Sequence, residues 1–129
     1  MRILLVDDNI DMRVVIGALI RQLWKGVELE LANGGREALQ MMHGGPYDVV
    51  LTDVQMPDMD GYEIAAAIRH MAAPHCHTKI ICMTGGRLAP EKIQQNGIDG
   101  HLLKPFSLDQ LRLKISEVVA VQLRTGQGV

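Results

Sequence analysis

Aromatic residues, cysteines and long apolar runs are all scarce in this chain of 129 residues. Only 3% of the residues are aromatic while 47% are hydrophobic, so a buried core has to be built from aliphatic residues and methionine. No apolar run approaches the roughly 20 residues that span a bilayer, and no signal-peptide pattern precedes the first apolar segment. Two cysteines, Cys76 and Cys82, suit free thiols in a reducing compartment, although the sequence leaves their pairing open. We therefore expect a cytoplasmic protein that does not insert into a membrane.

A surplus of positive charge is missing as well. The chain carries 13 Lys and Arg residues against 15 Asp and Glu residues, which gives a formal net charge of −2 and a pI near 6.2. Because binding to nucleic-acid phosphates needs a basic surface, we expect no direct contact with nucleic acid. The length suits one domain with a single core, and we place this domain at residues 1–122. The polar, glycine-containing residues 123–129 are expected to form a flexible tail.

The chain does contain a regular alternation of two kinds of segment. Short runs of β-branched residues and leucine predict strands at Met1 to Val6, Val27 to Leu31, Tyr47 to Asp53, Lys79 to Thr84 and His101 to Leu103. The segments between and after them predict helices, the first with its apolar stripe at Met12, Val15, Ile16, Leu19, Ile20 and Leu23. Strands and helices that alternate in this way predict an α/β fold, a doubly wound five-stranded parallel sheet of flavodoxin-like type with about five helices.

Side chains with useful chemistry stand at the ends of the expected strands. Asp7 and Asp8 follow the first strand, Asp53 ends the third, Thr84 ends the fourth and Lys104 follows the fifth. Because the carboxyl ends of parallel strands meet at one edge of the sheet, these groups should lie close together. Carboxylates about 4 Å apart repel by roughly 4 kcal/mol at an effective dielectric near 20, so the cluster needs a cation. Hard oxygen ligands favour Mg²⁺.

These motifs resemble the receiver domain of two-component response regulators and hybrid histidine kinases. The matching residues, in chain order, are Asp7-Asp8, Asp53 with Met56-Pro57 and Asp60-Gly61, Thr84 and Lys104-Pro105. The resemblance covers Ile3 to about Val119. It implies a phosphorylation switch rather than an enzyme, a domain that promotes its own phosphorylation and dephosphorylation. The implied partner is a histidine kinase or a histidine phosphotransfer protein, and the chain could be a stand-alone regulator or a piece of a hybrid kinase.

The resemblance assigns a role to each acidic residue. Asp53 is the expected phosphoacceptor, whose carboxylate takes a phosphoryl group from a histidine kinase or a small phosphodonor. Mg²⁺ is expected on Asp8, on Asp53 and on the backbone carbonyl of Gln55, with Asp7 acting largely through water.

The resemblance also implies a switch. Lys104, followed by a proline in a cis peptide bond, would pair with the phosphoryl oxygens, and Thr84 would donate its hydroxyl. The surface from about Leu88 to Val119 would then change, and it could also support a weak homodimer. Where the family commonly has Tyr or Phe, this chain has His101, which is either a weaker, pH-sensitive switch residue or simply exposed. Gly85 stands where the family often has alanine.

Rival functions fit these residues less well. A flavin-binding flavodoxin would need a glycine- or hydroxyl-rich phosphate loop where Asp7-Asp8 stands, and that pair repels phosphate. A haloacid-dehalogenase-type phosphatase would need a second acid at the position of Gln55. A receiver-like module that is never phosphorylated has no use for the intact acidic set. Pro74-His75-Cys76-His77 could be taken for a metal site, but adjacent ligands in one short loop cannot close a tetrahedron.

Overall fold

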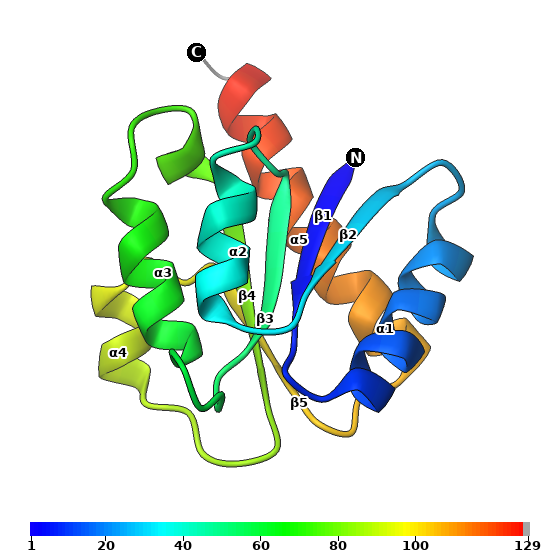
Figure 1. Cartoon of the computed structure of the whole chain (residues 1–129). Helices are drawn as coiled ribbons and strands as arrows, with labels where there is room; N and C mark the ends of the chain where they lie inside the picture. The colour runs from blue at the N-terminus through cyan, green and yellow to red at the C-terminus, as the bar shows by residue number, and fades with distance from the viewer. Residues whose placement is uncertain (128–129) are drawn as a thin grey trace.

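A five-stranded parallel sheet forms the centre of the molecule, with helices on both of its faces (Figure 1). The structure, a computed structural model, describes residues 1–127, with side chains described as far as residue 120. The strands are β1 (Arg2–Val6), β2 (Glu28–Ala32), β3 (Val49–Asp53), β4 (Lys79–Thr84) and β5 (Gly100–Leu103). The helices are α1 (Ile10–Leu23), α2 (Gly35–Met42), α3 (Gly61–Arg69), α4 (Pro90–Gln95) and α5 (Leu108–Gln127), with a 3₁₀ turn η1 (His75–His77). The predicted fold class is confirmed.

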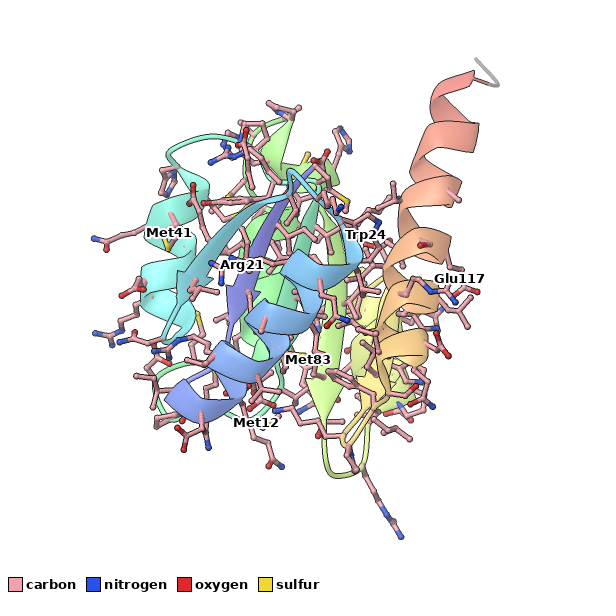
Figure 2. The ribbon with its side chains drawn as sticks, turned by 90° about the vertical axis from the view of Figure 1, so that its right-hand side faces the viewer. Met12, Arg21, Trp24, Met41, Met83 and Glu117 are labelled. Atoms are coloured by element: carbon pink, nitrogen blue, oxygen red, sulfur yellow. The ribbon has the colours of Figure 1, made fainter. Side chains whose placement is uncertain are left out.

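The strand order is β2-β1-β3-β4-β5, so the direction of winding reverses between β1 and β3. Helices α1 and α5 cover one face, and α2, α3 and α4 cover the other (Figure 1). Figure 2 looks onto the first of these faces, with Met12 and Trp24 at opposite ends of α1. Because loops diverge on either side of a reversal point, a crevice forms there at the carboxyl ends of the strands. In Figure 1 this is the lower edge of the sheet.

The core is aliphatic, as the composition predicts, and the sheet divides it into two halves. Leu4, Val6 and Val50 pack toward α2 and α3, whereas Ile3 and Leu5 pack toward α1 and α5. All of these side chains are fully buried. The central strands have no solvent-facing side, which explains why their sequences are continuous apolar runs rather than alternating ones.

Local sequence signals fix most helix ends. Asn9 caps α1 by accepting a hydrogen bond from the Met12 N–H at 3.1 Å, and Gly26 leaves that helix with φ +79°. The predicted capping box before α5 is present, because Ser107 and Gln110 exchange hydrogen bonds at 3.1 and 2.8 Å.

Helix α2 has no capping side chain of its own and takes one from another loop. Its N-cap is Gly34, and Asp58, which lies after β3, accepts hydrogen bonds from the N–H groups of Gly35 at 3.3 Å and Arg36 at 3.1 Å. A Cβ atom on Gly34 would lie 3.0 Å from an Asp58 carboxylate oxygen, so glycine leaves room for this contact. Asp58 thereby ties α2 to the loop that follows the phosphoacceptor candidate Asp53.

The last helix is longer than the sequence analysis indicates. Helix α5 continues to Gln127, so helical backbone extends into the segment 123–129 that we predicted to be a tail. No glycine or proline stands between Ser107 and Thr125, and residues such as Leu123 and Arg124 favour a helix. Residues 128 and 129 of the predicted tail lie outside the described residues, and the boundary at residue 122 stays a prediction. No helix in the described part of the chain is long and apolar enough to cross a membrane.

Candidate functional site

Three carboxylates converge at the carboxyl edge of the sheet. Val6 and Thr52 pair in register, so Asp7 and Asp53, the next residues, emerge side by side at the point where the strand order reverses. One carboxylate oxygen from each of Asp7, Asp8 and Asp53 lies within 4.8 Å of the other two. No other group of three or more potential metal ligands occurs in the part of the chain that the structure describes, so the segment from Pro74 to His77 forms none. The predicted acidic cluster is confirmed.

Burial differs strongly among the three acids. Asp7 is fully buried, the Asp53 side chain is 14% exposed, and Asp8 faces solvent. Burial is the main cause that raises the pKa of Asp53 above its ordinary value, and the nearby carboxylate of Asp7 adds to it. The Lys104 ammonium and the Gln55 backbone N–H act in the opposite direction without cancelling the shift. A cation close to the Asp53 carboxylate therefore stabilises its charged form.

Lys104, the residue that follows β5, supplies one such cation. Its ammonium nitrogen lies 3.2 Å from a carboxylate oxygen of Asp7 and 3.5 Å from one of Asp53. The Lys104–Pro105 peptide bond is cis, as the resemblance implies. The Lys104 backbone N–H also donates to the carbonyl of Thr84 at 2.8 Å, which joins the ends of β4 and β5.

Thr84 is at the predicted strand end, but its hydroxyl is engaged locally. The side chain is 2% exposed, and its oxygen accepts a hydrogen bond from the Gly86 N–H at 3.1 Å. A Cβ atom on Gly86 would lie 3.8 Å from the Thr84 hydroxyl oxygen and 3.9 Å from the Gln55 side-chain nitrogen. The loops after β3 and β4 therefore approach each other beside Asp53, with Gly86 between them.

His101 lies outside this group. Its side chain is exposed on β5, opposite Cys82 of β4, and it lines two surface hollows of about 340 and 370 Å³ together with Lys114 and Glu117 of α5. The structure brings the three acids and Lys104 together but leaves His101 on the edge strand. Its role in switching stays a prediction.

Sequence reasoning missed Arg13. Its guanidinium donates a hydrogen bond to the backbone carbonyl of Asp7 at 2.7 Å. Arg13 stands one helical turn after the N-cap Asn9, a spacing that could have placed it on the acidic side of α1.

The apolar stripe predicted for α1 is broader than the buried face of the helix. Val15 was expected to face the core, but it is 54% exposed. Ile10 at 63% and Val14 at 61% are exposed beside it. All three lie in the first two turns of α1, which begins two residues after Asp8, and we name them the α1 patch.

A five-stranded sheet in this order, with acids and a lysine at its carboxyl edge, defines the CheY-like class of flavodoxin-like domains. The chain belongs to the response regulator receiver domain family, whose profile matches residues 3–116. It is therefore a phosphoacceptor signalling domain of phosphorylation-dependent two-component systems, and not a typical enzyme. Receiver domains bind Mg²⁺ at an acidic pocket, and the residues at this edge fit that ion.

Known proteins similar to the chain include a short chemotaxis protein and much longer sensor proteins. The chemotaxis protein CheY of Pseudomonas aeruginosa is 34% identical over 120 residues, which cover 92% of the chain and 95% of that protein. The sensor protein GacS of Pseudomonas syringae pv. syringae is 34% identical over 127 residues, which cover 95% of the chain but 14% of GacS. The chain thus spans a small part of such sensor proteins and nearly all of the short chemotaxis protein.

Solved structures agree with the fold. Vibrio cholerae CheY4 superposes with a TM-score of 0.81 at 32% identity, covering 91% of the chain and 97% of CheY4. The receiver domain of a sensor histidine kinase from Pseudomonas aeruginosa PAO1 also gives a TM-score of 0.81, at 30% identity, covering 92% and 97% of the two chains. That second structure holds a magnesium ion in its active-site cleft.

Proposed function

We propose that Asp53 is the phosphoacceptor of this domain and that Mg²⁺ is held by Asp8, Asp53 and the backbone carbonyl of Gln55, with Asp7 acting through water. The observation that carries this proposal is the cluster of three carboxylates within 4.8 Å of one another, two of which, those of Asp7 and Asp53, contact the Lys104 ammonium. Bound Mg²⁺ supplies positive charge that neutralises the carboxylates and the oxygens of the incoming phosphoryl group. The cytoplasm is the proposed compartment.

The proposed reaction is transfer of a phosphoryl group. A carboxylate oxygen of Asp53 attacks the phosphorus atom, and the bond from phosphorus to the donor nitrogen or oxygen breaks, which leaves an acyl phosphate on Asp53. Lys104 exchanges a carboxylate partner for a phosphoryl oxygen. The Thr84 hydroxyl, whose oxygen accepts from the Gly86 N–H, donates its proton to another phosphoryl oxygen. The same residues would support hydrolysis of the acyl phosphate by water, so the domain promotes both its own phosphorylation and its dephosphorylation.

Movement of Thr84 and Lys104 would change the surface formed by α4, β5 and α5, from about Leu88 to Val119. This surface passes the signal to a partner, or the domain relays its phosphoryl group to a histidine phosphotransfer protein. Leu103 and Leu113, each 58% exposed on this surface, support a weak homodimer there.

The docking site for the histidine-bearing donor is proposed to be the α1 patch. Ile10, Val14 and Val15 adjoin the acidic edge, so a donor helix or loop packed against them would bring its histidine close to Asp53. A histidine kinase and a histidine phosphotransfer protein would share this site, because both present a phosphohistidine.

Phosphorylation of Asp53 can be tested with the purified domain. Acetyl phosphate with Mg²⁺ should add the mass of one phosphoryl group to the wild-type protein, and beryllofluoride should bind it as a mimic. Asp53→Asn should abolish both, because an amide cannot form the acyl phosphate. Asp58→Asn is the matched control, since Asp58 lies in the same loop outside the acidic cluster, and it should gain mass like the wild type. An equal gain in Asp53→Asn, measured by intact-protein mass spectrometry, would reject the assignment.

His101 is proposed as the switch residue that reports the phosphorylated state to a partner. If so, His101→Tyr should change the affinity for the partner or for a second copy of the domain by severalfold, while the rate of phosphorylation by acetyl phosphate stays near the wild-type rate. Analytical ultracentrifugation in the presence of beryllofluoride measures the affinity of the domain for a second copy of itself. Unchanged affinities in every phosphorylated complex would show that His101 is only an exposed residue.

A further inference from the structure

Arg13 is the one cationic side chain besides Lys104 that the described contacts bring to the acidic edge. Its Nη1 donates to the carbonyl oxygen of Asp7 at 2.7 Å, and the residue is half-buried. No carboxylate lies within ion-pair distance of Arg13 in the described part of the chain, so its guanidinium is committed to a backbone oxygen rather than to an acid.

The hydrogen bond from Arg13 to the Asp7 carbonyl fixes the peptide unit between Asp7 and Asp8. The carbonyl of Asp7 and the N–H of Asp8 share a rigid plane, so an anchor on that oxygen also sets the direction in which the chain continues at Asp8. Asp7 itself is already held at three points: its N–H donates to Ala32 at 3.2 Å, and its carboxylate takes hydrogen bonds from Asn9 at 3.0 Å and Lys104 at 3.2 Å. Of these three contacts only that of the Asn9 N–H lies beyond Asp8, and it closes a turn around this exposed residue. The Arg13 hydrogen bond is the one that acts on the carbonyl oxygen of Asp7 itself.

We propose that Arg13 is a positioning residue of the acidic site: its hydrogen bond to the Asp7 carbonyl holds the Asp7–Asp8 peptide so that the Asp8 carboxylate converges with that of Asp53. This inference rests on the proposed function, because it takes the cation at this site to be Mg²⁺. Arg13 touches neither the metal nor the phosphoryl group in this scheme and acts only through Asp8.

If Arg13 acted only through its charge, its loss would change the Mg²⁺ affinity in the opposite direction. A guanidinium near a divalent cation repels it, so loss of Arg13 would tighten Mg²⁺ binding if charge were all that mattered. If Arg13 positions Asp8, its loss weakens binding even though a positive charge has gone, because groups that orient metal ligands strongly affect affinity. The sign of the change in Mg²⁺ affinity therefore separates the two effects.

The experiment is a Mg²⁺ titration of the metal-free domain, followed by the NMR shifts of the Asp8 and Asp53 amides, with folding of each variant checked by thermal unfolding. Arg13→Ala should raise the Kd for Mg²⁺ roughly 10-fold. Arg13→Lys, which keeps a positive charge and an N–H donor on a long side chain, should recover most of this loss. Arg36→Ala removes an exposed arginine from α2 and should leave the Kd unchanged.

Three outcomes would overturn the inference. If the Kd of Arg13→Ala for Mg²⁺ is equal to or lower than the wild-type Kd, Arg13 does not position Asp8. The proposed function would stand in that case. A Kd in Arg13→Lys as high as in Arg13→Ala would show that a donor to the Asp7 carbonyl is not what matters. Wild-type protein whose Asp8 and Asp53 amides do not respond to Mg²⁺ would overturn the proposed metal site, and the inference with it.

Discussion

Asp58 is a single exposed carboxylate whose loss should weaken an entire helix. It accepts hydrogen bonds from the Gly35 and Arg36 N–H groups at the start of α2, and these bonds hold its pKa below the ordinary value. Asp58→Ala should lower the free energy of unfolding at pH 7 by about 1 kcal/mol, as expected for the loss of a helix cap. Chemical denaturation measures the difference.

The pKa shift also gives this contact a pH dependence with a defined sign. Because the folded-state pKa of Asp58 is lowered, its stabilisation is fully present above the ordinary aspartate pKa of about 3.9 and is lost as the pH falls through the folded-state pKa. The gap between wild type and Asp58→Ala should therefore shrink in acid. Asp58→Asn keeps an acceptor without a titrating proton, so its stability relative to Asp58→Ala should not follow this trend. A gap that stays constant from pH 7 to acid would contradict the capping role.

Which residues of the site could be predicted from the sequence depends on how each one is placed. Asp7 and Lys104 directly follow apolar strands and Asp53 ends one, so strand ends alone bring them to one edge. The contacts of Arg13 and Asp58 could not be predicted in this way, because each joins two segments whose distance is set by how a helix or loop packs. No strand pattern encodes that distance.

At the scale of elements, α4 is the least buried of the five helices in the described part of the chain. It has only six residues, none of them buried. At its start, the Ala89 N–H donates to the Tyr62 hydroxyl at 3.0 Å, and just after its end, Arg69 donates to the Gly97 carbonyl at 2.6 and 3.0 Å. Besides the packing of Leu88, Ala89 and Ile93 on the core, these two side chains of α3 hold both ends of α4, and this helix should respond first when one of them is lost.

Tyr62→Phe removes the acceptor of the Ala89 N–H with little change in volume. We expect amide hydrogen exchange in residues 89–97 to rise severalfold, while global stability falls by about 1 kcal/mol, the usual value of one hydrogen bond. Hydrogen exchange read by NMR measures both effects.

The matched control is Tyr47→Phe. Tyr47 is also buried and also bonds through its hydroxyl, but to Glu30. Its replacement should cost stability without raising exchange in α4. Equal exchange of α4 in wild type and Tyr62→Phe would show that the hydroxyl does not hold this helix.

Element boundaries were predictable where the signal is local. Pro90 starts α4 and Asn96-Gly97 ends it, with Gly97 at φ +65°, as the residue types indicate. The end of α5 carries no such stop before Gly126, so the sequence could not separate helix from tail there. Helix α2 begins at Gly35, and its N-cap residue Gly34 has no side chain to cap it, because the cap comes from Asp58.

At the scale of the whole molecule, the alternation of strands and helices is enough to predict the sheet and the edge that carries the site. Right-handed crossovers and the reversal of winding between β1 and β3 leave one crevice for Asp7 and Asp53. Within the α1 patch, the exposure of Val15 was not predictable, because its spacing fits the apolar stripe that was predicted to face the core. Only the packing of α1 on the sheet shows that Val15 stays outside.

The α1 patch leads to a prediction about partners. Val14→Glu should leave phosphorylation by acetyl phosphate unchanged, because Val14 is 61% exposed and does not belong to the acidic cluster. Phosphotransfer from a histidine kinase or a histidine phosphotransfer protein should fall by at least about 10-fold, since a buried unpaired carboxylate at an interface costs more than 1.4 kcal/mol.

Leu113→Glu provides the comparison that makes this result specific. Leu113 is a similarly exposed apolar residue, 58% exposed, but it lies on α5, on the output surface. Phosphotransfer kinetics with each purified donor should therefore distinguish the two variants. Val14→Glu should slow phosphorylation of the domain by the donor. Leu113→Glu should affect dimerisation or output and be phosphorylated at the wild-type rate. If both variants load at the wild-type rate from every donor that phosphorylates the domain, the donor docks elsewhere and the α1 patch serves another contact. If Leu113→Glu alone is slow, the α5 surface is the docking site and the roles of the two faces are reversed.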